Sequence, residues 1–309
     1  MVERDTGAGD AGRSTPHVPV LLQETMDLLG PRAGGVYVDC TVGHGGHSYE
    51  ILRMSGPDGV VIGIDRDPSA IAMAQERLRE FGNRFIPVRS NFERLVEIVR
   101  GAGRDTVDGM LFDFGVSSAQ LDLPGRGFTY NVDAPLDMRM DPDQETTAAD
   151  LVNEMEPGEL ARIIREYGEE RWAFRIAQFI AQKRKIRPIS TTAELVDVIK
   201  AAIPAAARRK GGHPARRTFQ ALRIATNREL EVIEKALRDA VGVTRRGGRV
   251  CAISFHSLED RIVKRTFASM SRERVRLLTR KPAMPGREEI ERNPRSRSAR
   301  LRAVEIEGF

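Results

Sequence analysis

Residues 36–47 read Val36-Tyr37-Val38-Asp39-Cys40-Thr41-Val42-Gly43-His44-Gly45-Gly46-His47. The first three residues are β-branched or aromatic, which is typical of a buried strand, and Ser48–Leu52 after the glycines can begin a helix. Glycines let a backbone approach a ligand closely, and a helix N-terminus offers free N–H donors. The stretch therefore predicts a cradle for a nucleotide-like ligand. Its glycine spacing differs from the G-x-G-x-x-G of dinucleotide sites, and a plain tight turn is the alternative interpretation.

Three further strands are expected after this cradle, each followed by polar residues. Residues 59–65 end in Asp65, whose carboxylate can bind ribose hydroxyls. The alternative role for Asp65 is to cap the next helix, and both roles can hold together. Residues 84–88 end near Asn91 and Phe92, and residues 108–115 carry Asp113 at their end. Four such β/α units predict an open parallel sheet of the Rossmann type, with a nucleoside at its carboxyl edge.

The remaining chain divides by its hydrophobic pattern. Residues 1–15 contain almost no large apolar side chain and are expected to be a disordered tail, followed by the first part of the core at 16–121. Residues 122–217 show no strand signal, so an all-helical insertion is expected there. The second part of the core, 218–309, is expected to open with one long helix over 218–240. Strands are expected at 248–255, 275–278 and 303–306.

Composition limits the class of protein. With 309 residues the chain has room for about two domains, and a net charge of +5 does not by itself imply a nucleic-acid partner. Cys40 and Cys251 both fall in predicted strands or at their ends, which favours free thiols in a reducing compartment. No apolar run approaches the ~18 residues of a membrane span, and residues 1–15 lack a signal-peptide core. A cytoplasmic protein is therefore expected.

Positive charge is concentrated in three segments: 183–187, 208–217 and 272–302, the last with a local net charge of +7. Solvated helix ends are one interpretation, and a surface that follows nucleic-acid phosphates is the favoured one. Charge alone does not distinguish RNA from DNA. The candidate phosphate contacts are Arg208, Arg209, Lys210, Arg216, Arg217, Arg295 and Arg297.

Two other places carry candidate chemistry. Asp113 lies where a group bound beside the ribose would react, and His256 follows the fifth strand; both are catalytic candidates. The alternative for the second place is a helix start capped by Ser257. His44 and His47 have no third ligand at a suitable spacing, so no metal is expected.

Several motifs together resemble one family. They are the glycine loop after Asp39, Gly63-Ile-Asp-Arg-Asp-Pro, Asp113-Phe-Gly-Val-Ser-Ser-Ala-Gln-Leu-Asp, Gly127-Phe-Thr-Tyr, Pro135-Leu-Asp-Met-Arg-Met-Asp, Arg217-Thr-Phe-Gln-Ala-Leu-Arg-Ile, Ser254-Phe-His-Ser-Leu-Glu-Asp-Arg and Asn293-Pro-Arg-Ser-Arg-Ser-Ala-Arg-Leu-Arg. In this order, from about His17 to Glu307, they resemble the bacterial 16S rRNA (cytosine-N4) methyltransferases.

The resemblance implies a class I methyltransferase sheet, with the insertion serving substrate recognition. It also implies S-adenosylmethionine as cofactor and methyl transfer to N4 of a decoding-centre cytidine in 16S rRNA of the small ribosomal subunit. Carried over motif by motif, the cofactor contacts are Gly45, Gly46, His47, Asp65, Phe92, Asp113 and Gln120.

Other functions stay open at this stage. A methyltransferase acting on another RNA or DNA amino group, or a non-catalytic RNA-binding Rossmann module, would share the basic segments. An NAD-dependent dehydrogenase would share the cradle but needs G-x-G-x-x-G and a hydride-site acid or base. The sequence also leaves the oligomeric state open, a homodimer being possible.

Overall fold

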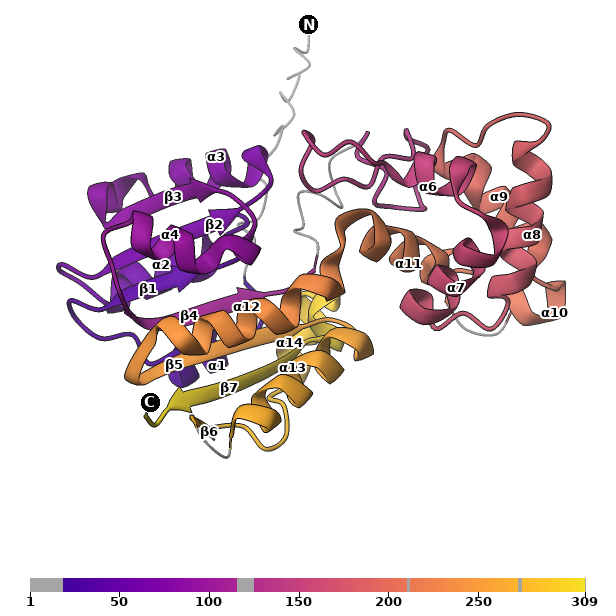
Figure 1. Ribbon diagram of the computed structural model, residues 1–309. Helices are drawn as coiled ribbons and strands as arrows, with labels where there is room; N and C mark the ends of the chain where they lie inside the picture. The colour runs from indigo at the N-terminus through magenta and orange to yellow at the C-terminus, as the bar shows by residue number, and fades with distance from the viewer. Residues whose placement is uncertain (1–18, 116–124, 210–211, 272–273, 309) are drawn as a thin grey trace, which may run out of the picture.

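The computed structural model describes residues 19–115, 125–209, 212–271 and 274–308, which form a seven-stranded sheet (Figure 1). The strand order is β3-β2-β1-β4-β5-β7-β6. The strands are β1 (Val36–Asp39), β2 (Val60–Asp65), β3 (Phe85–Arg89), β4 (Val107–Asp113), β5 (Thr244–Ser254), β6 (Val275–Leu277) and β7 (Arg300–Ile306).

The first five strands of the chain run parallel, and β7 runs antiparallel to both of its neighbours, β5 and β6. Pro87 cannot donate a ladder hydrogen bond, which fits its place in β3 at one edge of the sheet. β1 occupies the middle of the parallel part, with β2 on one side and β4 on the other. The order of strands reverses at β1, and ligands of open α/β sheets bind at such a point. The expected Rossmann-type sheet is confirmed.

Helices cover both faces of the sheet, because its strands are apolar on both sides. One face packs against α1 (Leu22–Leu29), α2 (Gly46–Met54) and α3 (Pro68–Arg77). The other packs against α4 (Leu95–Gly101), α12 (Glu229–Val243) and α13 (Ser257–Met270). Short helical segments complete this part: η1 (Arg79–Arg84), η2 (Phe92–Arg94), α14 (Arg287–Arg292) and η3 (Pro294–Ser298).

A second group of helices lies beside the sheet instead of over its faces (Figure 1). It comprises α6 (Ala148–Glu154), α7 (Pro157–Gly168), α8 (Ala173–Arg184), α9 (Thr192–Ala202), α10 (Ala205–Arg208) and α11 (Arg216–Asn227). These helices enclose an apolar cluster of their own, which runs from Phe128 to Leu222. A capping box of Thr191 and Glu194 opens α9, since both of its hydrogen bonds are present.

The expected single helix over 218–240 is wrong. The chain breaks at Arg228, which adopts a left-handed conformation with φ 51°, so that α11 and α12 are separate helices. Just before the break, the side-chain amide of Asn227 donates a hydrogen bond to the carbonyl of Met138 at 2.7 Å. Neither glycine nor proline marks this break in the sequence. Phe219 in α11 belongs to the second apolar cluster, whereas Ile233 in α12 packs on the sheet.

Two other expectations concern single residues. Cys40 and Cys251 are free and buried, as predicted. α13 is capped by the side chain of His256 and not by Ser257, because the ring accepts a hydrogen bond from the Glu259 N–H. Within the part of the chain that is described, no helix has the length and apolarity needed to span a bilayer. The expected tail over 1–15 lies outside the described residues.

Candidate active site

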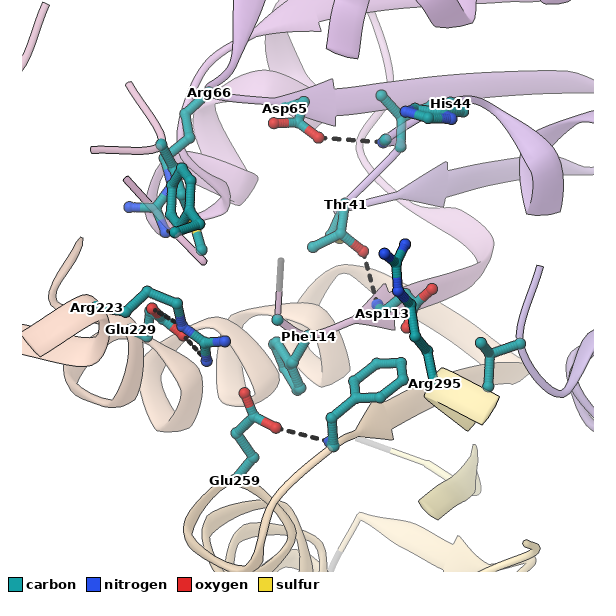
Figure 2. Close-up of a pocket in the computed structure, with 18 of the residues that line it drawn as sticks. Thr41, His44, Asp65, Arg66, Asp113, Phe114, Arg223, Glu229, Glu259 and Arg295 are labelled. Atoms are coloured by element: carbon teal, nitrogen blue, oxygen red, sulfur yellow. Dashed lines mark hydrogen bonds and ion pairs between the residues drawn. The ribbon is translucent and has the colours of Figure 1, made fainter. Parts of the chain in front are cut away.

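A cavity of about 470 Å³ opens at the carboxyl ends of the parallel strands, between the sheet and the second group of helices (Figure 2). From the sheet side it is lined by residues that follow four neighbouring strands: Gly43, His44, Gly46 and His47 after β1, Asp65 and Arg66 at β2, Ser90, Asn91 and Phe92 after β3, and Asp113 and Phe114 at β4. Five of the seven predicted cofactor contacts, His47, Gly46, Asp65, Phe92 and Asp113, thus face one space.

The glycine loop has the backbone that a cradle requires. Gly45 has φ +73° and is the residue before α2, a conformation that side chains with a Cβ rarely adopt. At Gly46, a Cβ would lie 2.3 Å from Cγ of Pro19. Gly45 does not itself line the cavity; it shapes the turn that directs the N-terminus of α2 toward it. The structure therefore explains both glycines, and their contact with a cofactor stays a prediction.

Asp65 ends β2 and holds the glycine loop. Its carboxylate accepts hydrogen bonds from the N–H groups of Gly43 at 3.1 Å and Asp67 at 2.9 Å. Burial raises the pKa of Asp65 to about 6, although both hydrogen bonds favour the ionised form. The helix cap suggested as an alternative is supplied by Asp67, which accepts from the Ser69 N–H. Asp65 lines the cavity, and its contact with a ribose stays a prediction.

Asp113 ends β4 with its carboxylate in the cavity. Its N–H donates to Oγ1 of Thr41 at 2.6 Å, which fixes the end of β4 against the loop after β1. Within the described residues, its Oδ1 atom is buried and has no hydrogen-bond partner. Burial, followed by repulsion from Asp39 and Glu259, raises the pKa of Asp113 well above its usual range. An unengaged acceptor of this kind can take a hydrogen bond from a ligand or from a water molecule.

Phe92 is held edge-on against Phe112, with ring centroids 5.7 Å apart. Asn91 precedes it and caps η2 by accepting from the Glu93 N–H. One side of the aromatic ring is therefore packed on the core while the residue lines the cavity. This arrangement suits an adenine platform, and the adenine contact stays a prediction.

The opposite wall belongs to the second group of helices. Arg216, Phe219, Gln220 and Arg223 recur on one face of α11, and all four line the cavity together with Phe128 and Tyr130. Arg223 donates two hydrogen bonds to Glu229, at 2.9 and 2.8 Å, across the break at Arg228. Since Glu229 and Glu259 also line the cavity, this wall offers both donors and acceptors beside an aromatic surface.

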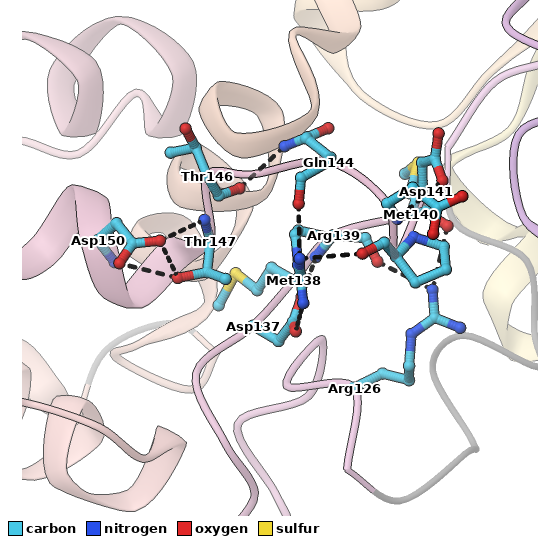
Figure 3. A network of polar contacts seen from close by, with 12 residues as sticks. Arg126, Asp137, Met138, Arg139, Met140, Asp141, Gln144, Thr146, Thr147 and Asp150 are labelled. Carbon is cyan, nitrogen blue, oxygen red and sulfur yellow. Dashed lines mark hydrogen bonds and ion pairs between the residues drawn. The ribbon is translucent and has the colours of Figure 1, made fainter.

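A loop of tightly bonded residues supports that wall (Figure 3). Asp137 and Arg139 form a bidentate pair, and Arg139 also donates to the carbonyl of Gln144 at 2.6 Å. Met140 lines the cavity, and its N–H donates to Oδ1 of Asn227 at 2.8 Å. The loop also reaches the sheet, because Arg126 pairs with Asp67 at 3.2 Å. It therefore couples α11 to the segment after β2.

His256 is not among the cavity residues, contrary to its place as a catalytic candidate. Its ring caps α13 and lies 3.1 Å from Glu259. Within the described chain, ligand atoms of Glu229, His256 and Glu259 lie within 4.8 Å of one another. Arg223 already neutralises Glu229, and Glu259 accepts from the Phe255 N–H at 2.8 Å. Glu229 is thus engaged by Arg223, and Glu259 by the backbone before α13 and the ring of His256.

The candidate phosphate contacts separate into different places. Arg208 and Arg209 are exposed at the end of α10, and Arg297 is exposed in η3. Arg217 donates to the carbonyl of Glu169 at 3.1 Å. Arg216 and Arg295 line the cavity, which the sequence did not indicate. Lys210 and the predicted cofactor contact Gln120 lie outside the described residues.

Sequence reasoning missed the cavity residues Arg66, Arg223 and Glu229. Glu229 opens α12, and Arg223 lies in α11 before the break. Their pairing therefore depends on a break that no glycine or proline signals. Arg66 follows Asp65 directly and donates to the carbonyl of Asn227 at 3.0 Å, a contact between segments far apart in the chain. Only the strand-end position of Arg66 was a usable signal.

Comparisons with known proteins show the family of this chain. Residues 14–307 match the MraW methylase family. A ribosomal RNA small subunit methyltransferase H of Symbiobacterium thermophilum is 56% identical over 93% of this chain and 96% of its own length. Proteins of the same name from Heliobacterium modesticaldum and Halothermothrix orenii are 53% and 50% identical, each over 94% of this chain and 98% of its own length. The chain belongs to the MraW methylase family.

Proposed function

We propose that this protein is an S-adenosylmethionine-dependent methyltransferase that methylates N4 of a cytidine in the decoding centre of 16S rRNA. The relatives that it matches over nearly their whole length are named as small-subunit rRNA methyltransferases. The substrate would then be the small ribosomal subunit or its rRNA, and the protein would act in the cytoplasm. The identity of the base and its position in the rRNA rest on the resemblance of the sequence motifs.

One observation carries the catalytic part of the proposal. The buried Oδ1 atom of Asp113, without a hydrogen-bond partner among the described residues, lies in the same cavity as the glycine loop and α11. A donor brought to this atom would stand between the cofactor cradle and the wall formed by α11. An exocyclic amine supplies such a donor.

The residues of the cradle fit the cofactor. The N-terminus of α2 and the glycine loop suit the amino-acid part, Asp65 suits the ribose hydroxyls, and Phe92 suits the adenine ring. When bound, S-adenosylmethionine supplies a methyl group on a positively charged sulfur. The three protein features follow successive neighbouring strands, so an extended nucleoside can contact all of them.

The chemistry needs an oriented amine and an acceptor for its proton, but not a strong base. The lone pair of an exocyclic cytosine amine is delocalised into the ring, so the amine must be oriented as its nitrogen becomes pyramidal. Asp113 would accept one N–H of the amine and hold it in line, and positioning of this kind contributes up to ~7–11 kcal/mol in well-aligned cases. After transfer, the nitrogen releases a proton, for which the carboxylate of Asp113 is an acceptor.

The wall of α11 would receive the base. Its arginines offer donors to the O2 and N3 acceptors of cytosine, and Phe219, Phe128 and Tyr130 offer apolar contact. We extend the proposal to the insertion over 122–217, which would hold the RNA with Arg208 and Arg209 at its exposed end. A homodimer is compatible with this arrangement.

Radioactive methyl transfer tests the proposal. The purified protein, small ribosomal subunits and S-adenosylmethionine labelled on the methyl group should give labelled 16S rRNA, and mass spectrometry of the nucleosides should identify N4-methylcytidine. The matched control is Asp113→Asn, which should lose transfer. Label in another nucleoside would contradict the cytosine assignment, and label in DNA would support the competing class of substrate. Cofactor binding without methyl transfer to any nucleic acid would contradict the proposal that the protein is a nucleic-acid methyltransferase.

A further inference from the structure

The segment 287–298, near the end of the chain, is part of the cavity. Asn293, Arg295 and Ser298 line it, although the glycine loop is more than two hundred residues away in sequence. Oε1 of Glu289 in α14 accepts a hydrogen bond from the Leu21 N–H at 2.8 Å, and Val20 beside it also lines the cavity. The C-terminal segment is therefore tied to the N-terminal residues that flank the cradle.

The backbone around Arg295 is held locally. Asn293 precedes η3, and its Oδ1 accepts from the Arg295 N–H at 3.3 Å. Ser296 is fully buried, and its hydroxyl donates to the carbonyl of Asn293 at 2.8 Å. These bonds fix the start of the Arg295 side chain at the cavity. Arg295 and Arg297 are both exposed, but only Arg295 lines the cavity.

The order of strands indicates which part of a bound cofactor would lie near Arg295. Asp65 and Phe92 follow β2 and β3, on one side of β1, whereas Asp113 ends β4 on the other side. In the view of Figure 2, the side chain of Arg295 extends toward the end of β4, with Asp65 farther away. A cofactor with its ribose at Asp65 would therefore present its amino-acid part, and not its adenine, to Arg295.

The acidic groups near this end of the cavity favour a cation beside the carboxylate of such a ligand. Asp113 ends β4 and lines the cavity, and the buried Asp39 ends the neighbouring strand β1. Burial raises the pKa of Asp113, and repulsion from Asp39 raises it further. These acids favour the sulfonium and the ammonium of S-adenosylmethionine but disfavour its carboxylate. A guanidinium is the side chain best suited to a carboxylate, since it offers two parallel donors.

We propose that Arg295 binds the α-carboxylate of S-adenosylmethionine, so that the C-terminal segment completes the cofactor site. This inference rests on the proposed function, because it takes that cofactor as given. It differs from the expectation that Arg295, like Arg297, is a phosphate contact. The N-terminus of α2 then adds a second, weaker contribution to holding the same carboxylate.

Two ligands that differ only in the carboxylate test it. Calorimetry would measure the affinity of the full-length protein for S-adenosylmethionine and for decarboxylated S-adenosylmethionine. Loss of a charged hydrogen bond lowers affinity roughly ten- to a hundredfold, so Arg295→Gln should weaken the first ligand by that factor and leave the second nearly unchanged. Arg295→Lys should recover part of the loss. Arg297→Gln, in the same short helix, should leave both affinities unchanged.

Each other outcome would overturn the inference. Equal weakening of both ligands would mean that Arg295 acts on the shape of the cavity. Unchanged affinity of Arg295→Gln for both ligands, with weaker binding of 16S rRNA, would mean that Arg295 contacts RNA phosphates. Thermal unfolding of each variant identifies any loss of folding. If the wild-type protein bound neither ligand, the proposed function itself would fail, and this result is distinct from a failure of Arg295 alone.

Discussion

Nδ1 of His47 lies 3.7 Å from Oδ2 of Asp113, so the first turn of α2 and the end of β4 meet at the cavity. The other ring nitrogen of His47, Nε2, lies 3.0 Å from the carbonyl of Val20. His47 therefore connects three separate segments of the chain. The side of Asp113 that faces His47 is thus occupied, while its other oxygen remains available to a ligand.

Replacement of Asp113 tests the acceptor role. Asp113→Asn keeps the shape but removes the carboxylate, and we expect methyl transfer to fall by at least ~10²-fold, a typical contribution of a proton acceptor. Because burial raises the pKa of Asp113 well above its usual range, the variant also removes a costly buried charge. Its free energy of unfolding at pH 8 should therefore equal or exceed that of the wild type. Wild-type transfer rates in the variant would contradict the assignment.

The pH dependence of cofactor binding tests Asp65. In the proposed site, ribose hydroxyls would donate to the ionised carboxylate, and burial raises the pKa of Asp65 to about 6. Below that pH the group is protonated, so affinity for S-adenosylhomocysteine should fall roughly tenfold at one pH unit below the pKa. Between the usual value of 3.8 and about 6, the folded protein holds a proton that the unfolded chain has lost. The contribution of Asp65 to stability therefore falls as pH rises through this window and is constant above it.

Asp65→Asn supplies the control for that titration. Its affinity at pH 7.5 should be roughly ten- to a hundredfold lower than that of the wild type, and its pH dependence should be smaller. Asp39, whose pKa burial also raises to about 6, does not line the cavity and should act mainly on stability. A variant with unchanged affinity, measured by calorimetry on folded protein, would rule out the ribose contact.

The pair Arg223 and Glu229 should be necessary for the fold of the cavity wall. Their side chains are 15% and 7% exposed, so Arg223→Met leaves a buried carboxylate without its main partner. Breaking such a pair costs about 3–5 kcal/mol, whereas replacing both residues by apolar ones costs much less. Urea unfolding of Arg223→Met, Glu229→Leu and the double variant would measure the coupling. Arg238→Ala, in the exposed pair with Glu234, should change stability by less than about 1 kcal/mol.

Asn227 and Asn153 form a matched pair for testing the loop at Met140. Each side chain bonds a distant backbone N–H, a distant carbonyl and the carbonyl four residues earlier in its own helix. Replacement of either by Ala should therefore cost a similar amount, about 2–3 kcal/mol in the free energy of unfolding. Only Asn227→Ala should also weaken methyl transfer, because Met140 lines the cavity. Equal methyl-transfer activity of the two variants would mean that the loop at Met140 does not contribute to catalysis.

Local patterns determined much of the fold. The apolar runs, the glycines after β1 and the acids at the ends of β2 and β4 were sufficient for the parallel sheet and for the place of the cradle. The helical character of the chain after residue 147 and the capping box at Thr191 could likewise be recognised from the sequence. These features depend on residues close together in the chain, where period, turn chemistry and capping act directly.

The cavity wall was decided by contacts that only the tertiary structure creates. The break at Arg228 depends on Asn227 reaching Met138 and on Arg223 reaching Glu229, and a sequence pattern continuous through α11 and α12 hides it. His256 became a cap because its ring meets the Glu259 N–H, and Arg295 became a cavity residue because Glu289 ties its segment to Leu21. Charge and periodicity identify what a side chain offers, whereas long-range packing alone determines what it meets.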